Sequence, residues 1–185
     1  MRILGISGSL RRDSSNTKLL RAAEELLPPF AELKIWDELK AVPPFDEDDE
    51  LAAPAVVESL REAVAEADAI LVATPEYNAS VPGQLKNAVD WLSRPVATSV
   101  LRGKPALVVG ASTGAFGAVW AQAELRKVLA TAGARVVEAE VAVGHAPVKF
   151  DEQGALVDDE LNDQLVEALE VLAAELPVRP VALAV

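Results

Sequence analysis

The amino-acid sequence predicts an α/β fold of the doubly wound kind, in which helices cover both faces of a parallel sheet. Short apolar runs alternate along the chain with longer segments that place apolar residues at helical spacing. Strands that are joined by helices run parallel, with right-handed crossovers. The chain has 185 residues, of which 51% are hydrophobic, so it can bury one sizeable core. We therefore predict a single domain over residues 1–185.

Five short segments are predicted as strands. The run from Ile3 to Ser7 has the length of a buried strand, and residues 32–36 alternate between polar and apolar side chains, which fits a strand at a sheet edge. Residues 69–73 are apolar on both faces, as central parallel strands are. The remaining strands are expected at residues 106–110 and within residues 135–143.

Five longer segments carry apolar residues at helical spacing and are predicted as helices. Pro28 ends the first of them, and Gly133 follows the fourth as a C-cap. Five strands with helices between them, at this length, predict the sheet order 2-1-3-4-5 of flavodoxin-like folds. The predicted helices are Asn16–Leu27, Pro54–Ala67, Pro82–Leu92, Gly117–Ala132 and Asp158–Glu175.

The composition excludes several classes of function. The formal net charge is -12, with only 17 basic residues, so most of the surface would repel nucleic acid. The chain has no cysteine and one histidine, which excludes disulfides, thiolate metal sites and a cysteine nucleophile. No segment approaches the roughly 20 apolar residues that span a bilayer, and the N-terminal apolar run is too short for a signal peptide. We expect a cytoplasmic protein with no metal, membrane or nucleic-acid partner.

Three loops are expected to meet at the carboxyl ends of strands one, three and four, where ligands bind on such sheets. The first, Gly8–Asn16, opens a helix and carries hydroxyl, amide and guanidinium groups. Free N–H groups at a helix N-terminus bind phosphate, and arginine adds charge-assisted hydrogen bonds. The loop has neither a Walker A motif nor G-x-G-x-x-G. Ser14, Ser15 or Asn16 would also serve as an ordinary N-cap, but the whole loop favours phosphate binding.

The other two loops are suited to contact a flat ring. Residues 74–82 are stiffened by two prolines and offer Tyr77 and exposed N–H groups. Alternatively, Tyr77 packs within the protein, and Glu76 is a solvated carboxylate or a charge at a helix N-terminus. Residues 111–117 contain two glycines and two hydroxyls, which let a backbone approach a ligand closely, although an ordinary βα turn has the same composition.

Four motifs resemble the NADPH-dependent FMN reductase family, which includes quinone, chromate and azo-dye reductases. They are G-S-L-R-x-x-S-x-N at residues 8–16, a proline-rich acidic segment at 42–48, P-E-Y-N at 75–78 and a glycine-rich loop at 112–117. The resemblance runs from Met1 to about residue 175. One departure is that Ala118 follows Gly117, where many relatives have a second glycine, and that Trp120 stands where a smaller or basic residue is common.

The resemblance implies a binding role for each of the three loops. It implies that the FMN phosphate is held by Ser9, Arg11, Ser14 and Asn16, with Ser15 beside them. It places Pro75, Glu76, Tyr77 and Asn78 along the isoalloxazine ring. It places Ser112, Gly114 and Gly117 against the other side of that ring.

The function that the resemblance implies is hydride transfer from NAD(P)H, through FMN, to a small acceptor: a quinone, an azo compound, chromate or free flavin. The flavin supplies the chemistry, so no side chain is assigned a catalytic role, and N–H groups around Asn78 are expected to stabilise negative charge on the reduced ring. The rival is a one-electron carrier of the flavodoxin kind, since fold alone cannot separate the two. The acidic surface favours the carrier, whereas the arginine-bearing loop and P-E-Y-N favour the reductase. NADH and NADPH both stay open.

The third predicted helix indicates self-association. With the residue before it, this helix carries more apolar surface than one face of a peripheral helix needs, which predicts a homodimer or tetramer. The alternative is that the apolar residues are all buried within one protomer. They are Val81, Leu85, Val89, Trp91 and Leu92. The tail after Pro177 is expected to be either disordered or packed on a partner subunit.

Overall fold

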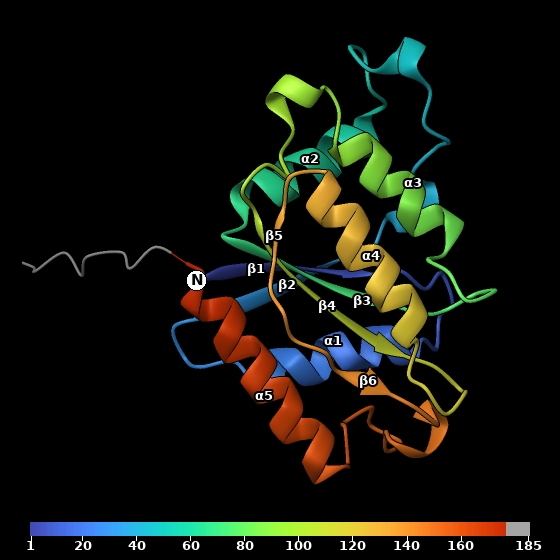
Figure 1. The fold of residues 1–185 in the computed structure, drawn as a ribbon, viewed down its shortest axis with the longest axis vertical. Helices are drawn as coiled ribbons and strands as arrows, with labels where there is room; N and C mark the ends of the chain where they lie inside the picture. Colours follow the sequence, from blue (N-terminus) through green and yellow to red (C-terminus); the bar gives the residue numbers. More distant parts are fainter. Residues whose placement is uncertain (177–185) are drawn as a thin grey trace, which may run out of the picture.

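The computed structural model describes residues 1–176 and has the predicted order of strands (Figure 1). The order β2-β1-β3-β4-β5 confirms the flavodoxin-like prediction and places β2 at a sheet edge. All strand pairs are parallel. The strands are β1 (Arg2–Ser7), β2 (Glu32–Trp36), β3 (Ala69–Thr74), β4 (Pro105–Ala111), β5 (Arg135–Val136) and β6 (Ala142–Val143). The tail after Pro177 lies outside the described residues.

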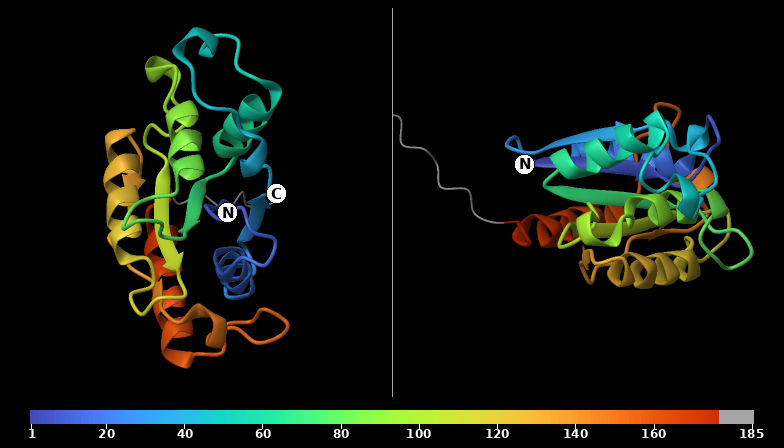
Figure 2. Two further views of the ribbon diagram at one scale, coloured as in Figure 1. Left: turned by 90° about the vertical axis from the view of Figure 1, so that its right-hand side faces the viewer. Right: turned by 90° about the horizontal axis from the view of Figure 1, so that it is seen from above.

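Five helices cover the two faces of the sheet (Figures 1 and 2). They are α1 (Ser15–Glu25), α2 (Ala55–Glu66), α3 (Gly83–Leu92), α4 (Val119–Thr131) and α5 (Asp159–Ala174). One apolar cluster joins α2, α3 and α4 to one face, which includes Ile70 and Val108. A second cluster joins α1 and α5 to the other face, which includes Leu71 and Leu107. Neighbouring residues of a central strand thus enter opposite clusters, because both faces of the sheet are buried.

The fifth predicted strand is interrupted. It was predicted within residues 135–143, and the structure divides that stretch into β5 and β6, which both pair with β4. Arg135 pairs with Pro105 and Ala142 with Gly110, so 7 residue steps on the edge segment face 5 on β4. The two extra residues form a bulge, as edge strands often do. Glu140 lies in this bulge and forms an ion pair with Arg126 of α4 at 3.0 Å.

The apolar residues of α3 are buried within the protomer. Each of the five residues that indicated self-association is at most 9% exposed. Trp91 packs edge-to-face on Phe45, with ring centroids 5.0 Å apart, and its Nε1 donates to the Pro43 carbonyl at 2.9 Å. Asn87 holds the same proline-rich segment through the Pro43 carbonyl and the Phe45 N–H, at 2.8 and 2.7 Å. The prediction that these five residues form a subunit contact is therefore wrong, because the proline-rich segment and the sheet cover them.

Asn16 joins the start of α1 to the end of β4. Its side chain is buried, with only 3% of the residue exposed. Its Nδ2 donates to the Ala111 carbonyl at 2.9 Å, and its Oδ1 accepts from the Ala111 N–H at 3.0 Å. Both polar groups of the last β4 residue are satisfied by this one amide. The loops that follow β1 and β4 are therefore held at a fixed separation.

Replacing Asn16 should destabilise the fold. In Asn16→Ala, a buried N–H and a buried carbonyl lose their partners, and each such group costs about 1–3 kcal/mol. We expect the free energy of unfolding to fall by about 2–6 kcal/mol in urea denaturation of the flavin-free protein. Asn162→Ala is the matched control, because Asn162 donates a single bond, to the Leu156 carbonyl at 2.9 Å. An equal loss in both variants would contradict the assigned role of Asn16.

Candidate functional site

The three loops that follow β1, β3 and β4 meet at one edge of the sheet, as predicted (Figure 1). The Gly8 N–H donates to the Ala73 carbonyl at 2.8 Å, which joins the first loop to the end of β3. Asn16 joins the first loop to the end of β4. Glu76, in the second loop, reaches the beginning of α4. The loops of the candidate site are therefore held in place by hydrogen bonds to neighbouring strands and to α4.

The first loop ends in a helix N-terminus with free donors. Ser14 is the N-cap of α1, and its side chain accepts from the Thr17 N–H at 3.2 Å. The N–H groups of Ser15 and Asn16 make no hydrogen bond with any residue of 1–176. Such groups, together with the positive end of the helix dipole, attract an anion. The buried Ser14 and Asn16 side chains thus build the terminus, while the backbone supplies the donors.

The charges in this loop also favour an anion. The exposed Arg11 side chain forms neither a hydrogen bond nor an ion pair within the described part of the chain, although its backbone N–H donates to the Ser9 Oγ at 3.4 Å. Asp13, by contrast, is paired with Lys18 at 2.7 Å. The hydrogen bond and charge of Lys18 hold the pKa of the Asp13 carboxyl below its usual value. The acid near the helix start is therefore neutralised by Lys18, and Arg11 is left for a ligand.

The second loop forms a tight turn. The N–H of Tyr77 donates to the Ser80 carbonyl at 3.2 Å, and that of Ser80 donates back at 3.1 Å. Asn78 and Ala79 between them have φ angles of 54° and 58°, the left-handed pair of a type I′ turn. The left-handed conformation costs about 1–3 kcal/mol in backbone strain at Ala79. The N–H groups of Asn78 and Ala79 make no hydrogen bond within residues 1–176, so both can serve a ligand.

Two carboxylates lock this turn to α4. Glu76 accepts from the N–H groups of Trp120 and Ala121, both at 3.1 Å. It supplies the cap that Ala118, the N-cap residue of α4, lacks. Glu124 of α4 accepts in return from the Ser80 hydroxyl at 2.6 Å and the Val81 N–H at 3.2 Å. The hydrogen bond from Ser80 is the main reason that the pKa of Glu124 lies below its usual value.

Of the interpretations open for Glu76, the structure shows a charge at a helix N-terminus. Both N–H groups donate to one oxygen of its carboxylate, Oε2, so a contact with a cofactor would have to come from Oε1 or from its backbone. Pro75 beside it is buried, and its carbonyl accepts from the Thr74 hydroxyl at 2.8 Å. The signal that could have identified this role is the absence of a Ser, Thr, Asp or Asn at the start of α4.

The third loop is held by close backbone contacts. Gly117 has a φ of 57°, and a Cβ there would lie 2.3 Å from the Ala142 carbonyl carbon. A Cβ on Gly144 would lie 2.2 Å from the Ala115 carbonyl oxygen. The buried Gln122 donates to the Gly117 carbonyl at 2.9 Å. Only glycine permits this packing, so the loop is fixed against the segment after β6.

This loop leaves a row of donors free. The N–H groups of residues 113–117 make no hydrogen bond with the described residues. The Ser112 Oγ donates to the Gly114 carbonyl at 3.3 Å, and the Gly114 carbonyl also accepts from the His145 N–H at 2.9 Å. Carbonyl groups of the loop thus accept hydrogen bonds from the protein, whereas these N–H groups stay free. Such a donor set suits the carbonyl oxygens and the negative charge of a flavin ring.

Exposed aromatic side chains border the site. Tyr77, Phe116 and Trp120 are 53%, 62% and 51% exposed. The rings of Phe116 and Trp120 meet edge-to-face, with centroids 5.1 Å apart. Among residues 1–176, Tyr77 is about half exposed and lies outside the buried core, which favours the ring contact over internal packing. Phe116 was not among the residues predicted for the site, although an aromatic residue inside a glycine-rich loop was the available signal.

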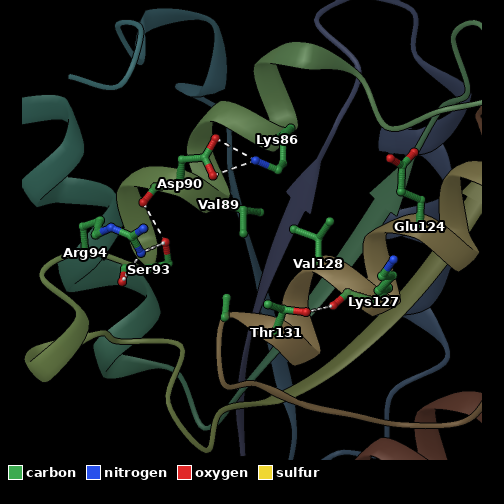
Figure 3. A pocket seen from close by; sticks show the side chains of 10 residues that line it. Lys86, Val89, Asp90, Ser93, Arg94, Glu124, Lys127, Val128 and Thr131 are labelled. Carbon is green, nitrogen blue, oxygen red and sulfur yellow. Dashed lines mark hydrogen bonds and ion pairs between the residues drawn. The ribbon is translucent and has the colours of Figure 1, made fainter. Parts of the chain in front are cut away.

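A separate groove of about 330 Å³ lies between α3 and α4 (Figure 3). Lys86 and Asp90 face each other on α3 and form an ion pair at 2.7 Å. Val89 and Val128 lie between the two helices. No residue of the three loops lines this groove. Residues 1–176 also hold no cluster of three His, Asp or Glu side chains placed for a metal ion, and no helix among them is long and apolar enough to cross a membrane.

The free groups of the three loops fit FMN. An open helix N-terminus with Arg11 suits a dianionic phosphate, and two loops with free N–H groups suit the polar edge of a flat ring. These groups belong to a preformed framework, because each loop is bonded to a neighbouring loop or strand. The donor chemistry therefore agrees with an elongated ligand that carries a phosphate and a ring.

Comparison with known proteins agrees with this site. The model of the NADPH-dependent FMN reductase family matches residues 1–148. An NAD(P)H-dependent FMN reductase of Pseudomonas aeruginosa is 42% identical over 174 residues, covering 93% of both chains. A 2-hydroxy-1,4-benzoquinone reductase of a Burkholderia species is 36% identical, covering 94% of this chain and 95% of its own.

Solved structures give the same result. FerB, a flavoenzyme NAD(P)H:(acceptor) oxidoreductase from Paracoccus denitrificans, superposes with a TM-score of 0.83 at 30% identity, covering 95% of this chain and 99% of its own. The family match spans all three loops of the site, and the relatives span nearly the whole chain. The chain therefore belongs to the NADPH-dependent FMN reductase family, an oxidoreductase family that uses FMN with NAD(P)H as the electron donor.

Proposed function

We propose that this protein reduces a small acceptor, such as a quinone, by two-electron hydride transfer from NAD(P)H through bound FMN. The observation that carries the proposal is the convergence of three loops, each of which leaves some backbone N–H groups without a partner within residues 1–176. The names of the relatives, an FMN reductase and a quinone reductase, support the same activity. Azo compounds, chromate and free flavin are the other acceptors considered.

Bound FMN would supply the redox chemistry, which is hydride uptake from the nicotinamide and delivery of two electrons to the acceptor. The protein's part is to bind and orient it. The N-terminus of α1 and the Arg11 guanidinium would hold the phosphate, with the Ser9 and Ser15 hydroxyls beside them. The turn at Asn78 and the N–H groups of residues 113–117 would hold the ring and stabilise negative charge on it. No side chain has to donate or accept a proton in this scheme.

A one-electron carrier explains the site less well. The acidic surface that favours a carrier is present, with a net charge of -12. The family and the named relatives, however, are reductases. We therefore assign the protein to the enzymes.

We also propose that the protein is a homodimer, or a tetramer made of dimers. Because the apolar residues of α3 are buried within the protomer, this proposal rests on the family resemblance, which implies pairing through the region of α3. The groove between α3 and α4 is the exposed part of that region (Figure 3). A location in the cytoplasm stays a prediction from the sequence.

The visible spectrum tests the proposed function. The purified protein should bind FMN in preference to FAD and riboflavin. Anaerobic NADPH or NADH should bleach the flavin absorbance in a single two-electron phase, and benzoquinone should restore it. Absence of FMN binding under native conditions would refute the assigned site. Reduction in two separate one-electron steps, with no turnover on NAD(P)H and benzoquinone, would favour the carrier.

Arg11→Ala should weaken FMN binding by roughly 10- to 150-fold, since a hydrogen bond to a charged group contributes about 1.5–3 kcal/mol. Riboflavin, which lacks the phosphate, should bind the variant and the parent almost equally. Both dissociation constants can be measured by flavin fluorescence at one fixed salt concentration. Arg12→Ala is the matched control, because Arg12 is also exposed and should matter less. If Arg11→Ala weakens riboflavin as much as FMN, Arg11 supports the loop and does not hold the phosphate.

Light scattering tests the assembly. At micromolar concentration the mass should be two or four times the 19.5 kDa of one chain. Charge reversal at the groove, as Lys127→Glu, should weaken an association that uses α4, because Lys127 is exposed there. A monomeric mass for the unmodified protein would contradict the proposal.

A further inference from the structure

We propose that Phe116 and Trp120 form an aromatic platform that binds the acceptor, and that this platform selects a planar conjugated ring over a charged inorganic acceptor. The inference deepens the proposed function and rests on it. It concerns two side chains, of Phe116 and Trp120, to which the proposed function gives no contact with the cofactor.

The exposed aromatic residues are concentrated at one place. The chain has four Phe, three Trp and one Tyr. Within residues 1–176, the exposed ones are Phe30, Tyr77, Phe116 and Trp120. Phe30 lies far from the site, before β2, where its carbonyl accepts from the N-terminal ammonium at 2.8 Å. The other three border the candidate site. Apolar side chains that lie exposed together mark a binding surface, and residues 1–176 leave each of these three more than half exposed.

Two contacts place Trp120 beside the ring-binding turn. Its own N–H donates to Glu76, the residue before Tyr77. Glu124 lies one helical turn further along α4, on the same face, and holds Ser80 at the end of that turn. Trp120 therefore borders the turn whose free N–H groups are assigned to the flavin ring. A molecule resting on Trp120 would lie next to that ring.

Phe116 is presented by a rigid backbone. Its neighbours Ala115 and Gly117 are in close backbone contact with Gly144 and Ala142. The Phe116 ring packs edge-to-face on Trp120 at an interplanar angle of 67°, yet each residue stays more than half exposed. Two rings that are fixed before binding lose little conformational entropy when a ligand stacks on them. The pair is therefore suited to hold a flat ligand.

The chemistry of the pair defines the ligand. Aromatic rings attract other rings through offset or edge-to-face contacts, and their faces carry partial negative charge. The whole chain has a net charge of -12, which disfavours an oxyanion acceptor. A nicotinamide ring is tethered to the phosphates and adenosine of its dinucleotide, so its binding has other sources. A quinone has only its ring. The platform therefore matters most for the acceptor.

The test compares the two halves of the reaction in the FMN-loaded enzyme. In Trp120→Ala and Phe116→Ala, we expect kcat/KM for a naphthoquinone to fall about tenfold, which corresponds to about 1.4 kcal/mol of lost stacking. The rate of anaerobic flavin reduction by NADPH, and kcat/KM for ferricyanide, which has no ring, should change less than about twofold. Trp120→Phe should recover most of the loss. Phe30→Ala, which removes an equally exposed ring elsewhere, is the control.

Each outcome distinguishes this inference from the proposed function. If NADPH does not reduce the flavin of the unmodified protein, the proposed function fails. If it does, but the quinone rate is unchanged in both variants, the platform is refuted. Equal losses with quinone and ferricyanide would indicate a structural role, and a loss confined to NADPH would assign the rings to the nicotinamide. A smaller mass by light scattering with an unchanged quinone rate would assign them to a subunit contact. Equal losses, a loss confined to NADPH and a smaller mass each overturn the inference, as does an unchanged quinone rate.

Discussion

The reciprocal pair of hydrogen bonds between Asn16 and Ala111 fixes the geometry on which the site depends. Ala111 ends the central strand β4, and Asn16 starts the helix that follows β1. These elements belong to different βα units, and their loops would otherwise move separately. A buried amide that satisfies one N–H and one carbonyl holds them together, because breaking it leaves both groups without water or partner. The phosphate end and the ring end of the site are thereby set relative to each other.

Most of the site is made of backbone, and the conspicuous side chains support it. Ser14 and Asn16 build the N-terminus of α1, and Glu76 builds that of α4. Gln122 fixes the carbonyl of Gly117. The residues that carry the family resemblance are thus mainly the ones that orient N–H groups. This arrangement fits chemistry performed by a cofactor, for which the protein supplies position and electrostatics.

The parts of the fold that depend on local periodicity could be predicted from the sequence. The first four strands and all five helices lie within a few residues of their predicted bounds, and the sheet order follows from the alternation of elements. The interruption between β5 and β6 could not, because apolar periodicity does not reveal two extra residues relative to a neighbouring strand. The burial of the α3 residues also could not, since periodicity shows which face is apolar and not what covers it. The contact from Glu76 to α4 joins residues 44 positions apart, a distance at which local pattern carries no information.

The carboxylate of Glu76 has a consequence for the direction in which a ligand can lie. The helices α1 and α4 follow the first and third loops of the candidate site, and each would present the positive end of its dipole to an anion. At α4 that end is already neutralised from within by Glu76, whereas at α1 Asp13 is drawn to Lys18 and the terminus stays open. A molecule with a phosphate at one end and a ring at the other would find two similar helix ends if both were open. Because the end of α4 is closed, these two helix ends differ. A mononucleotide with its phosphate at α1 is therefore favoured over the same molecule reversed end for end.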